Sequence, residues 1–386
     1  MKIAIITPSF PYPKRGERGL YGIERYSENL ATNLKKINHN VKIITTFWNG
    51  GKRYDNYKGI PILRILDSKA LIGKLGSFFY FNYLTFGLNL LRKKNYKFFK
   101  DSDVIIMNLA INSISFFKIK RVPIFSIFHH RQPLEFMSYY ITYPFLHYME
   151  KRQFRRFKNV ITVSNASKND IIKYYGLNEK YIKVIPNGID TKNFNPKNNS
   201  KEIREKYGNN ILLYSGLMIP RKGVSVLLKA MPYVIKEIPD VHLILTGEGP
   251  SLNNWKNLSN TLGIQNYISF LGFLDEELLL KYYATCDIFV FPSRKEGFGQ
   301  VILEAMASGT PVICANIPPM SDIIGGGGKT FKLNDSKDLS KKIIELLLDQ
   351  KKLETLREKA LGEVKKYDWT YVAEIYISHF KELSQK

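Results

Sequence analysis

Residues 286–316 read CDIFVFPSRKEGFGQVILEAMASGTPVICAN, and this stretch carries the strongest fold signal in the chain. Its apolar run IFVF closes at Pro292, which is the pattern of a buried parallel strand. The segment QVILEAMAS reads as a short helix, and Gly309 stands where a helix commonly ends in the left-handed conformation. A strand that leads through a loop into a helix is the repeating unit of a parallel α/β sheet.

Two glutamates flank the junction between this loop and this helix. Glu296 lies in the loop and Glu304 on the predicted helix. Between them, Gly297, Phe298 and Gly299 bring backbone N–H groups to the helix N-terminus. Unpaired donors and the helix dipole at that end favour an anion such as a diphosphate. The pair alone is equally compatible with two solvated surface charges.

Length and composition favour two soluble domains. The chain has 386 residues, enough for two separate cores, and 44% of them are hydrophobic. Its two cysteines, Cys286 and Cys314, lie in or beside apolar runs, so a disulfide framework is not expected and a reducing cytoplasm is favoured.

The sequence favours neither a signal peptide nor a membrane span. The start, MKIAIITPSFPYP, fits a first strand better than a signal peptide. The apolar segment 70–91 is interrupted by Lys74 and favours a buried or interfacial helix over a membrane span.

The positive charge is concentrated in the first half of the chain. The formal net charge is +24, and residues 1–190 hold 32 Lys and Arg against 12 Asp and Glu, whereas residues 191–386 hold 26 against 22. A basic surface attracts anionic lipid, lipid-linked phosphate and nucleic acid by the same Coulomb interaction, so the charge does not choose among them. No nucleic-acid motif accompanies it, and no nucleic-acid partner is expected.

Apolar strands and amphipathic helices alternate along both halves. In the first half, strands are expected at 2–8, 41–47, 103–110, 123–130 and 159–164, with helices at 24–36 and from Lys168. In the second half, strands are expected at 210–216, 241–249, 267–274, 286–292 and 310–316. The stretch 184–202, rich in Asn and Pro, is typical of a linker. The pattern predicts two Rossmann-like sheets with a boundary near residue 190.

Glycine turns follow several predicted strands. Gly22 opens the first helix, Gly216 precedes Arg221 and Lys222, and Gly247 follows the strand VHLILT. Flexible backbone at such turns can approach a phosphate, and fixed cations there can neutralise a leaving diphosphate. Each turn is also compatible with an ordinary loop.

Two further pairs of residues are of types that can carry chemistry. His129 and His130 end a predicted strand, where an imidazole can donate to a ligand hydroxyl, although a histidine at a strand end is more often structural. Asp101 and Asp103 imitate a D-x-D metal motif but precede a strand, where a turn is the better interpretation. No Cys/His cluster has ligand spacing, so no metal is expected.

The order of these motifs resembles the retaining glycosyltransferases of family 4. The pattern E-G-F-G-x-x-x-x-E-A-M-A-x-G-x-P-V, which starts at Glu296, is similar to the E-x7-E motif of that family. The segment 216–223 resembles G-R-L-x-x-x-K-G, with Leu217 in the place of the usual arginine. The resemblance covers nearly the whole chain and is strongest from 160 to 315.

The resemblance implies a GT-B fold with two Rossmann-like domains that face each other across a cleft. Residues 1–190 would bind the acceptor and residues 191–368 the donor, and the last helix, about 369–386, would cross back to the first domain. The implied reaction moves a sugar from a nucleoside diphosphate sugar to a glycan or lipid-linked acceptor with retention, without metal or cofactor. The implied catalytic residues are Glu296 and His129. The implied donor-binding residues are Gly22, Gly216, Arg221, Lys222, Gly247, Phe298, Gly299 and Glu304.

Leu217 stands where the family usually has an arginine, and Arg221 is expected to supply the missing guanidinium group. The aromatic and basic segments 78–86 and 136–158 are interpreted as an interfacial surface, with buried core an equal alternative for the first of them. The protein is therefore expected in the cytoplasm, peripheral at the inner face of the cell membrane. Three other functions stay open: a nucleotide-sugar epimerase of the same fold, a non-catalytic relative, and a nucleic-acid binder.

Overall fold

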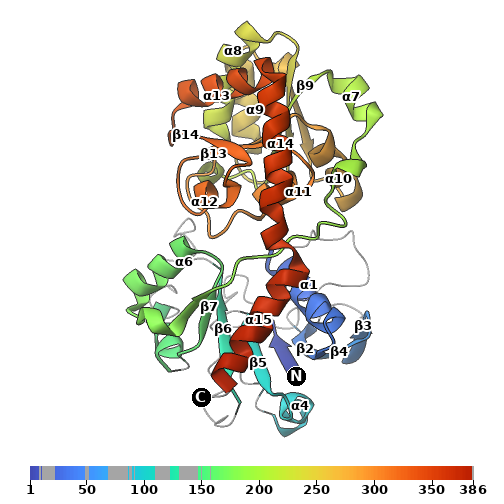
Figure 1. The fold of residues 1–386 in the computed structure, drawn as a ribbon, viewed down its shortest axis with the longest axis vertical. Coiled ribbons are helices and arrows are strands. Elements are labelled where there is room, and N and C mark those ends of the chain that lie inside the picture. The colour runs from blue at the N-terminus through green and yellow to red at the C-terminus, as the bar shows by residue number, and fades with distance from the viewer. Residues whose placement is uncertain are drawn as a thin grey trace. The chain divides into compact units, whose positions relative to one another are not determined.

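The chain divides into two compact units, and each is described by itself. The computed structural model describes residues 1–7, 10, 22–47, 52–67, 86, 89–90, 92–108, 122–129, 147–148, 150–156 and 158–384. Unit 1 comprises Met1–Gly188 and Trp369–Lys386, and unit 2 comprises Ile189–Asp368. The chain thus enters unit 2 within the predicted linker and returns to unit 1 for its last helix (Figure 1).

The described part of unit 1 contains an eight-stranded sheet in the order β3-β4-β2-β1-β5-β6-β7-β8. Its strands are β1 (Lys2–Ile6), β2 (Asn40–Phe47), β3 (Tyr54–Tyr57), β4 (Ile60–Asp67), β5 (Val104–Asn108), β6 (Ile124–Phe128), β7 (Val160–Thr162) and β8 (Ile182–Val184). They pair in parallel, except that β3 is antiparallel to β4. The α-helices described in unit 1 are α1 (Gly22–Lys36), α4 (Lys93–Phe99), α6 (Asn165–Asp170) and α15 (Trp369–Ser384).

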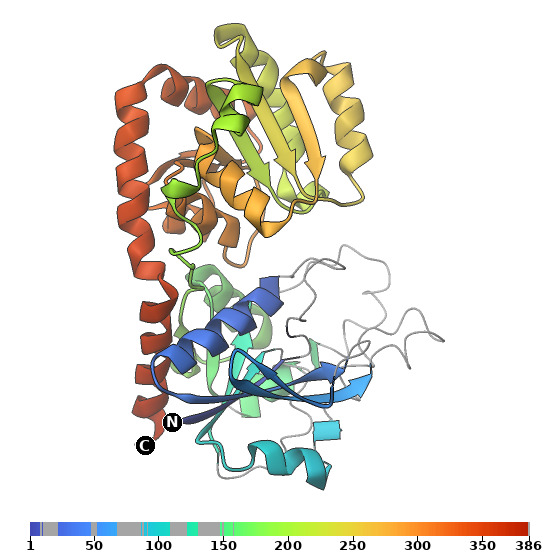
Figure 2. The same ribbon diagram turned by 90° about the vertical axis from the view of Figure 1, so that its right-hand side faces the viewer.

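Both faces of this sheet are buried, because its central strands are largely apolar. β5 and β6 are buried throughout. Alternate residues of β1 point to opposite cores. Ile3 and Ile5 join a cluster with α1 and α15, which lie side by side (Figure 1), whereas Ala4 and Ile6 pack in the core that contains Phe99 of α4. Figure 2 shows α1 (blue) and α4 (cyan) on opposite faces of the sheet.

Unit 2 contains a six-stranded parallel sheet in the order β11-β10-β9-β12-β13-β14. Its strands are β9 (Asn210–Ser215), β10 (Val241–Thr246), β11 (Ile268–Gly272), β12 (Ile288–Phe291), β13 (Val312–Ala315) and β14 (Gly328–Phe331). Its α-helices are α7 (Lys201–Tyr207), α8 (Val224–Glu237), α9 (Leu252–Thr261), α10 (Glu276–Thr285), α11 (Gln300–Ala307), α12 (Met320–Ile324), α13 (Ser336–Leu348) and α14 (Gln350–Val364).

Each sheet has a point at which its strand order reverses. In unit 2 the chain builds β9, β10 and β11 to one side and then continues with β12, β13 and β14 on the other, so β9 and β12 are neighbours at the reversal. In unit 1 the corresponding neighbours are β1 and β5. In open α/β sheets, ligands bind outside the carboxyl ends of the strands at such a switch point. These two places are therefore where functional side chains are expected.

The elements predicted from 286–316 are confirmed. The predicted strand is β12, the predicted helix is α11, and Gly309 follows α11 with φ +78°. The hairpin of β3 and β4 was not predicted, because β3 reads YDNY and carries little apolar signal. The predicted helix at 24–36 is α1, which begins two residues earlier at Gly22.

The structure bears on the prediction of free cysteines, but on little of the predicted helix at 70–91. Cys286 and Cys314 are free and buried, and burial raises the pKa of each thiol to about 12, so both stay protonated. Among the described residues, no helix has the length and apolarity needed to cross a membrane. Most of the segment 70–91 lies outside the described residues.

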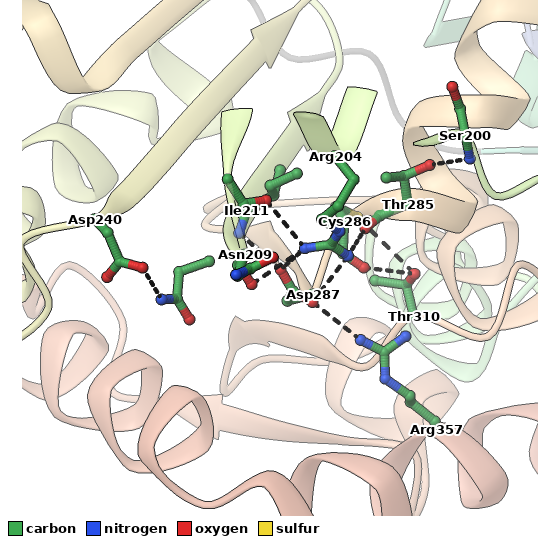
Figure 3. Close-up of polar contacts among 12 residues, drawn as sticks. Ser200, Arg204, Asn209, Ile211, Asp240, Thr285, Cys286, Asp287, Thr310 and Arg357 are labelled. Atoms are coloured by element: carbon green, nitrogen blue, oxygen red, sulfur yellow. Dashed lines mark hydrogen bonds and ion pairs between the residues drawn. The ribbon is translucent and has the colours of Figure 1, made fainter. Parts of the chain in front are cut away.

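One carboxylate at the amino ends of β9 and β12 connects four elements of unit 2 (Figure 3). Asp287 accepts hydrogen bonds from Arg204 Nη1 of α7 at 2.7 Å and from the backbone N of Ile211 in β9 at 2.8 Å. Arg357 of α14 adds a third donor, with Nη2 at 3.3 Å from Oδ1 of Asp287. Both arginine side chains are partly buried, so water screens these charge-assisted bonds less than it screens exposed pairs.

Replacing Asp287 with Asn is expected to destabilise unit 2 by about 2–3 kcal/mol, because two partly buried guanidinium groups lose their shared counter-charge. Urea denaturation followed by hydrogen exchange of peptides from 189–368 measures the change, with unit 1 peptides as an internal reference.

The matched control is Asp240→Asn, because Asp240 is exposed and its one contact drawn in Figure 3 is a hydrogen bond that it accepts from Asn210. Its effect should stay within about 0.5 kcal/mol. Equal effects of the two substitutions would contradict the role given to Asp287.

Candidate functional site

The loop after β9 forms the first part of the site in unit 2. Tyr214 at the end of β9 donates its hydroxyl to the carbonyl of Leu217 at 3.0 Å. A 3-10 turn, Pro220–Lys222, follows, and Gly223 ends it with φ +71°. A Cβ on Gly223 would lie 2.0 Å from the carbonyl oxygen of Pro292, so only glycine lets this loop reach the end of β12. The helix α8 begins directly after Gly223.

The loop after β10 contacts the loop after β9 through backbone. Gly247 has φ +116°, and a Cβ there would lie 2.1 Å from the carbonyl oxygen of Gly216. Met218 N donates to the carbonyl of Glu248 at 2.8 Å, which joins the two loops. The structure therefore brings two predicted residues, Gly216 and Gly247, into direct contact at the carboxyl ends of adjacent strands.

The loop after β12 places Glu296 against both predicted cations. Oε1 of Glu296 lies 2.7 Å from Lys222 Nζ and 3.4 Å from Arg221 Nη1, and it accepts the Ser293 hydroxyl at 2.6 Å. Arg221 also donates to the backbone carbonyl of Lys295. The side chains are 11% exposed for Glu296, 13% for Lys222 and 18% for Arg221, so these ion pairs are stronger than solvated surface pairs.

Glu296 stays ionised in this environment. Burial raises the pKa of its carboxyl, but the Lys222 ammonium and then the Arg221 guanidinium outweigh burial and hold that pKa below its usual value. Lys222 Nζ also lies over the ring of Phe291, 5.0 Å from its centroid. The structure thus assembles an anion and two cations at the switch point between β9 and β12.

Glu304 lies on the buried side of α11. Its side chain accepts the hydroxyl of Tyr283, in α10, at 2.9 Å, and Glu304 is 4% exposed. Gly299, with φ +104°, precedes α11, and Phe298 packs edge-on against Tyr367 with 6.2 Å between ring centroids. The Phe298 side chain is buried within unit 2, so a ligand contact there would involve its backbone. Neither Glu296 nor Glu304 is a solvated surface charge, which removes that alternative.

His129 lies beside the switch point of unit 1, directly after β6, which neighbours β5. Its Nε2 is 2.7 Å from Oδ1 of Asn108, the last residue of β5. Gly22 is exposed at the start of α1, and a Cβ on it would meet no described atom within 4 Å. His130 lies outside the described residues. His129 and Gly22 belong to unit 1, whereas the other predicted site residues belong to unit 2.

Three residues that contact predicted site residues are not predicted from the sequence. Ser293, Tyr283 and Asn108 each hold a predicted residue, and each lies at least three positions from its partner along the chain. A polar residue at the end of an apolar strand or just beyond it is the one local signal, and it applies to Asn108 and Ser293. Nothing local distinguishes Tyr283 from its neighbour Tyr282.

The acidic pair at 101–103 forms a strand-entry turn. Asp103 Oδ2 accepts from the backbone N of Lys2 at 2.7 Å, and Asp103 N donates to the carbonyl of Lys2 at 2.8 Å. Within the part of the chain that the structure describes, no group of three His, Cys, Asp or Glu side chains could hold a metal ion.

Replacing Lys222 with Met is expected to raise the pKa of Glu296, because it removes the stronger of the two opposing charges. The folded-state pKa of Glu296 is depressed, so its ion pairs stabilise the fold above the unfolded pKa, and this contribution is lost as the pH falls through the folded pKa. The variant should therefore lose less stability on acidification. Carboxyl ¹³C NMR across a pH titration measures the pKa directly.

The exposed Lys229 of α8 provides the control, since Lys229→Met should leave the Glu296 titration unchanged. An unchanged pKa in Lys222→Met would show that the ammonium does not control this carboxyl.

Comparison with known proteins identifies the family. Residues 21–193 match the family model described as Glycosyltransferase Family 4, and residues 196–362 match the model described as Glycosyl transferases group 1. The chain is 27% identical over 332 residues to an uncharacterized glycosyltransferase of Methanocaldococcus jannaschii, covering 84% of this chain and 83% of that protein. It is 26% identical over 374 residues to the alpha-monoglucosyldiacylglycerol synthase of Streptococcus pneumoniae, covering 90% of this chain and 78% of that one.

Among solved structures, HepE of Anabaena in complex with UDP-glucose superimposes with a TM-score of 0.74 at 22% identity, covering 99% of this chain and all of that one. At this identity the likeness bears on the fold alone. Together with the two family models, it agrees with two parallel sheets and a last helix that packs with the first unit. The chain belongs to the glycosyltransferases of family 4 and has the GT-B fold.

Proposed function

We propose that this protein transfers a sugar from a nucleoside diphosphate sugar to a glycan or lipid-linked acceptor, with retention of the anomeric configuration and without a metal. The observation that carries the proposal is the convergence of Lys222, Arg221 and Glu296 at the switch point of unit 2. The solved relative HepE holds UDP-glucose, and the S. pneumoniae relative is named for a glycolipid product. The first supports a nucleotide-sugar donor, and the second supports a lipid as the acceptor.

The diphosphate would bind between the loops after β9 and β12. Lys222 and Arg221 supply two positive charges there, and α8 and α11 both begin at this edge after a glycine in the left-handed region, Gly223 and Gly299. The N–H groups in the first turn of a helix point toward its amino end, and the dipoles of α8 and α11 favour negative charge there. Two cations and two helix N-termini are sufficient to neutralise a diphosphate, which is why no metal is required.

The remaining residues would orient the nucleoside and the sugar. Glu304 would accept hydrogen bonds from the ribose hydroxyls, with Tyr283 fixing its carboxylate. Glu296, ionised between the cations, would hold a sugar hydroxyl, and His129 would act on the sugar from unit 1. The backbone near Phe273, a 62% exposed residue after β11, would border the base.

Charge development decides how these residues would accelerate transfer. As the bond between the anomeric carbon and the diphosphate oxygen breaks, the sugar ring becomes positive and the leaving phosphate gains negative charge. Lys222 and Arg221 act where that negative charge grows, so they stabilise the transition state more than the bound donor. The oxygen of the acceptor hydroxyl forms the new bond to the anomeric carbon, and its proton passes to the departing diphosphate oxygen.

We further propose that the protein lies in the cytoplasm and associates peripherally with anionic membrane at the inner face of the cell membrane. Five basic residues on and beside α4 are exposed: Arg92, Lys93, Lys94, Lys97 and Lys100. Beside them Tyr54 is 58% exposed and packs against Phe98, with 6.5 Å between ring centroids. Basic residues near an anionic surface contribute about 1 kcal/mol each, and an aromatic side chain suits the interface.

Glu304→Gln is expected to weaken binding of the preferred donor about 10- to 100-fold, because a carboxylate that accepts two hydroxyls becomes an amide. Titration with UDP-, GDP- and ADP-sugars, without added metal, measures the affinity and identifies the base. Binding to none of the three would favour a non-catalytic relative, and conversion of the donor without an acceptor would favour an epimerase.

Arg221→Gln is expected to lower kcat about 100-fold with little change in folding, because it removes a cation that stabilises the leaving diphosphate. The control Arg294→Gln changes an exposed arginine in the loop after β12, which bonds Asn334, and should stay within about twofold of wild type. Turnover of Arg221→Gln at the wild-type rate would refute the proposal that Arg221 compensates for Leu217.

Replacing Lys93, Lys94 and Lys97 with Glu is expected to weaken co-sedimentation with acidic liposomes at low salt by at least about tenfold. The control changes three exposed lysines of unit 2, Lys201, Lys229 and Lys236, to Glu, which alters the net charge equally. Equal losses in both triple variants would leave net charge as the cause and refute a surface centred on α4.

A further inference from the structure

A buried chain of hydrogen bonds leads to His129 across the switch point of unit 1. Thr7 follows β1, Ser27 lies on α1, and Asn108 ends β5. Ser27 Oγ donates to Thr7 Oγ1 at 3.3 Å, Asn108 Nδ2 donates to Ser27 Oγ at 2.6 Å, and Asn108 Oδ1 lies 2.7 Å from His129 Nε2. Thr7 and Ser27 are fully buried, and Asn108 is 1% exposed. A polar network at this depth is costly unless its donors and acceptors match.

The donor-to-acceptor direction of these hydrogen bonds determines which ring nitrogen of His129 carries a hydrogen. A serine hydroxyl has one hydrogen, and Ser27 directs it to Thr7, so Ser27 accepts from the Asn108 amide nitrogen. The amide oxygen of Asn108 then faces His129. Because a carbonyl oxygen only accepts, His129 Nε2 must be the donor, and in the neutral ring Nδ1 carries the lone pair.

The ring and backbone of His129 are also fixed by neighbouring side chains. Tyr26 of α1 packs edge-on against the imidazole, with 4.7 Å between ring centroids. The Tyr26 hydroxyl bonds that of Tyr376 in α15, and both tyrosines are buried. Ser167 of α6 donates to the His129 carbonyl at 3.2 Å. The imidazole is thus held in one plane, in which Asn108 can select one tautomer.

We infer that Asn108 is a positioning residue that holds His129 as the Nε2–H tautomer, with Ser27 and Thr7 fixing the orientation of the Asn108 amide. A ligand hydroxyl that reaches Nδ1 would then meet an acceptor. The effect of Asn108 on sugar transfer rests on the proposed function, whereas the tautomer itself does not. The experiment therefore reads the tautomer separately from activity.

The test uses NMR of the full chain labelled with ¹⁵N-histidine, in water and without substrate. The sequence contains six histidines, and His129→Gln identifies the resonances of His129 by their loss. The wild type should show a downfield proton on Nε2 of His129 that is protected from exchange with water, because that proton is hydrogen-bonded to Asn108. Such a proton on Nδ1, or none on either nitrogen, would overturn the inference.

Three variants complete the test. In Asn108→Leu the acceptor is gone, so the protected Nε2 proton should disappear. In Asn108→Asp the acceptor remains and gains charge, so the proton should persist and the pKa of His129 should rise. Ser27→Ala should speed exchange of the proton, because the Asn108 amide loses its anchor. A signal that is unchanged in Asn108→Leu would contradict the inference.

Folding and activity are controlled separately. Hydrogen exchange of unit 1 peptides reports whether each variant is folded, and if Asn108→Leu does not fold, the wild-type and Asn108→Asp spectra decide. In transfer assays Asn108→Leu should lower kcat about 10- to 100-fold, with recovery in Asn108→Asp. Absence of transfer in the wild type would refute the proposed function and leave the tautomer assignment standing.

Discussion

The ion pairs of Glu296 with Lys222 and Arg221 join the two strands at which unit 2 reverses its strand order. The cations follow β9 and the carboxylate follows β12, so the site exists only where these strands are neighbours. At the opposite ends of the same two strands, Asp287 contacts Ile211 N and two arginines. The central strand pair is therefore held by charge at both ends, and only the carboxyl end presents its charges beside two helix N-termini.

Unit 1 also places functional groups at the switch point of its sheet, but there they are polar residues and not ion pairs. At its switch point Thr7, Ser27 and Asn108 form a series of hydrogen bonds that ends at His129. Unit 2 thus offers positive charge and a carboxylate, which suit a phosphate and hydroxyls, whereas unit 1 offers an oriented imidazole. This division assigns the charged groups of the proposed donor site to unit 2 and the imidazole to unit 1. It follows from strand topology, because each unit places its functional groups at its own switch point.

The sequence predicted the elements that carry strong local patterns. The apolar run before Pro292 and the glycine after α11 were sufficient to place β12 and α11. The sequence could not show that Arg221 and Lys222 reach one carboxylate, because adjacent residues often point apart, and here a tight turn ended by Gly223 brings both to Glu296. The hydrogen bond between Tyr283 and Glu304 depends on how α10 and α11 pack, and no local sequence pattern encodes that packing.

Hydrogen exchange of the full protein tests the donor site at the switch point of unit 2 most directly. Calorimetry first establishes which nucleoside diphosphate binds, and exchange is then measured with and without a saturating concentration of it. Protection is expected in three loops of unit 2, at 216–224, 247–251 and 293–304, because the diphosphate would bind their backbone amides and the cations between them. Protection confined to unit 1, or absent from these loops while the ligand is bound, would contradict the account.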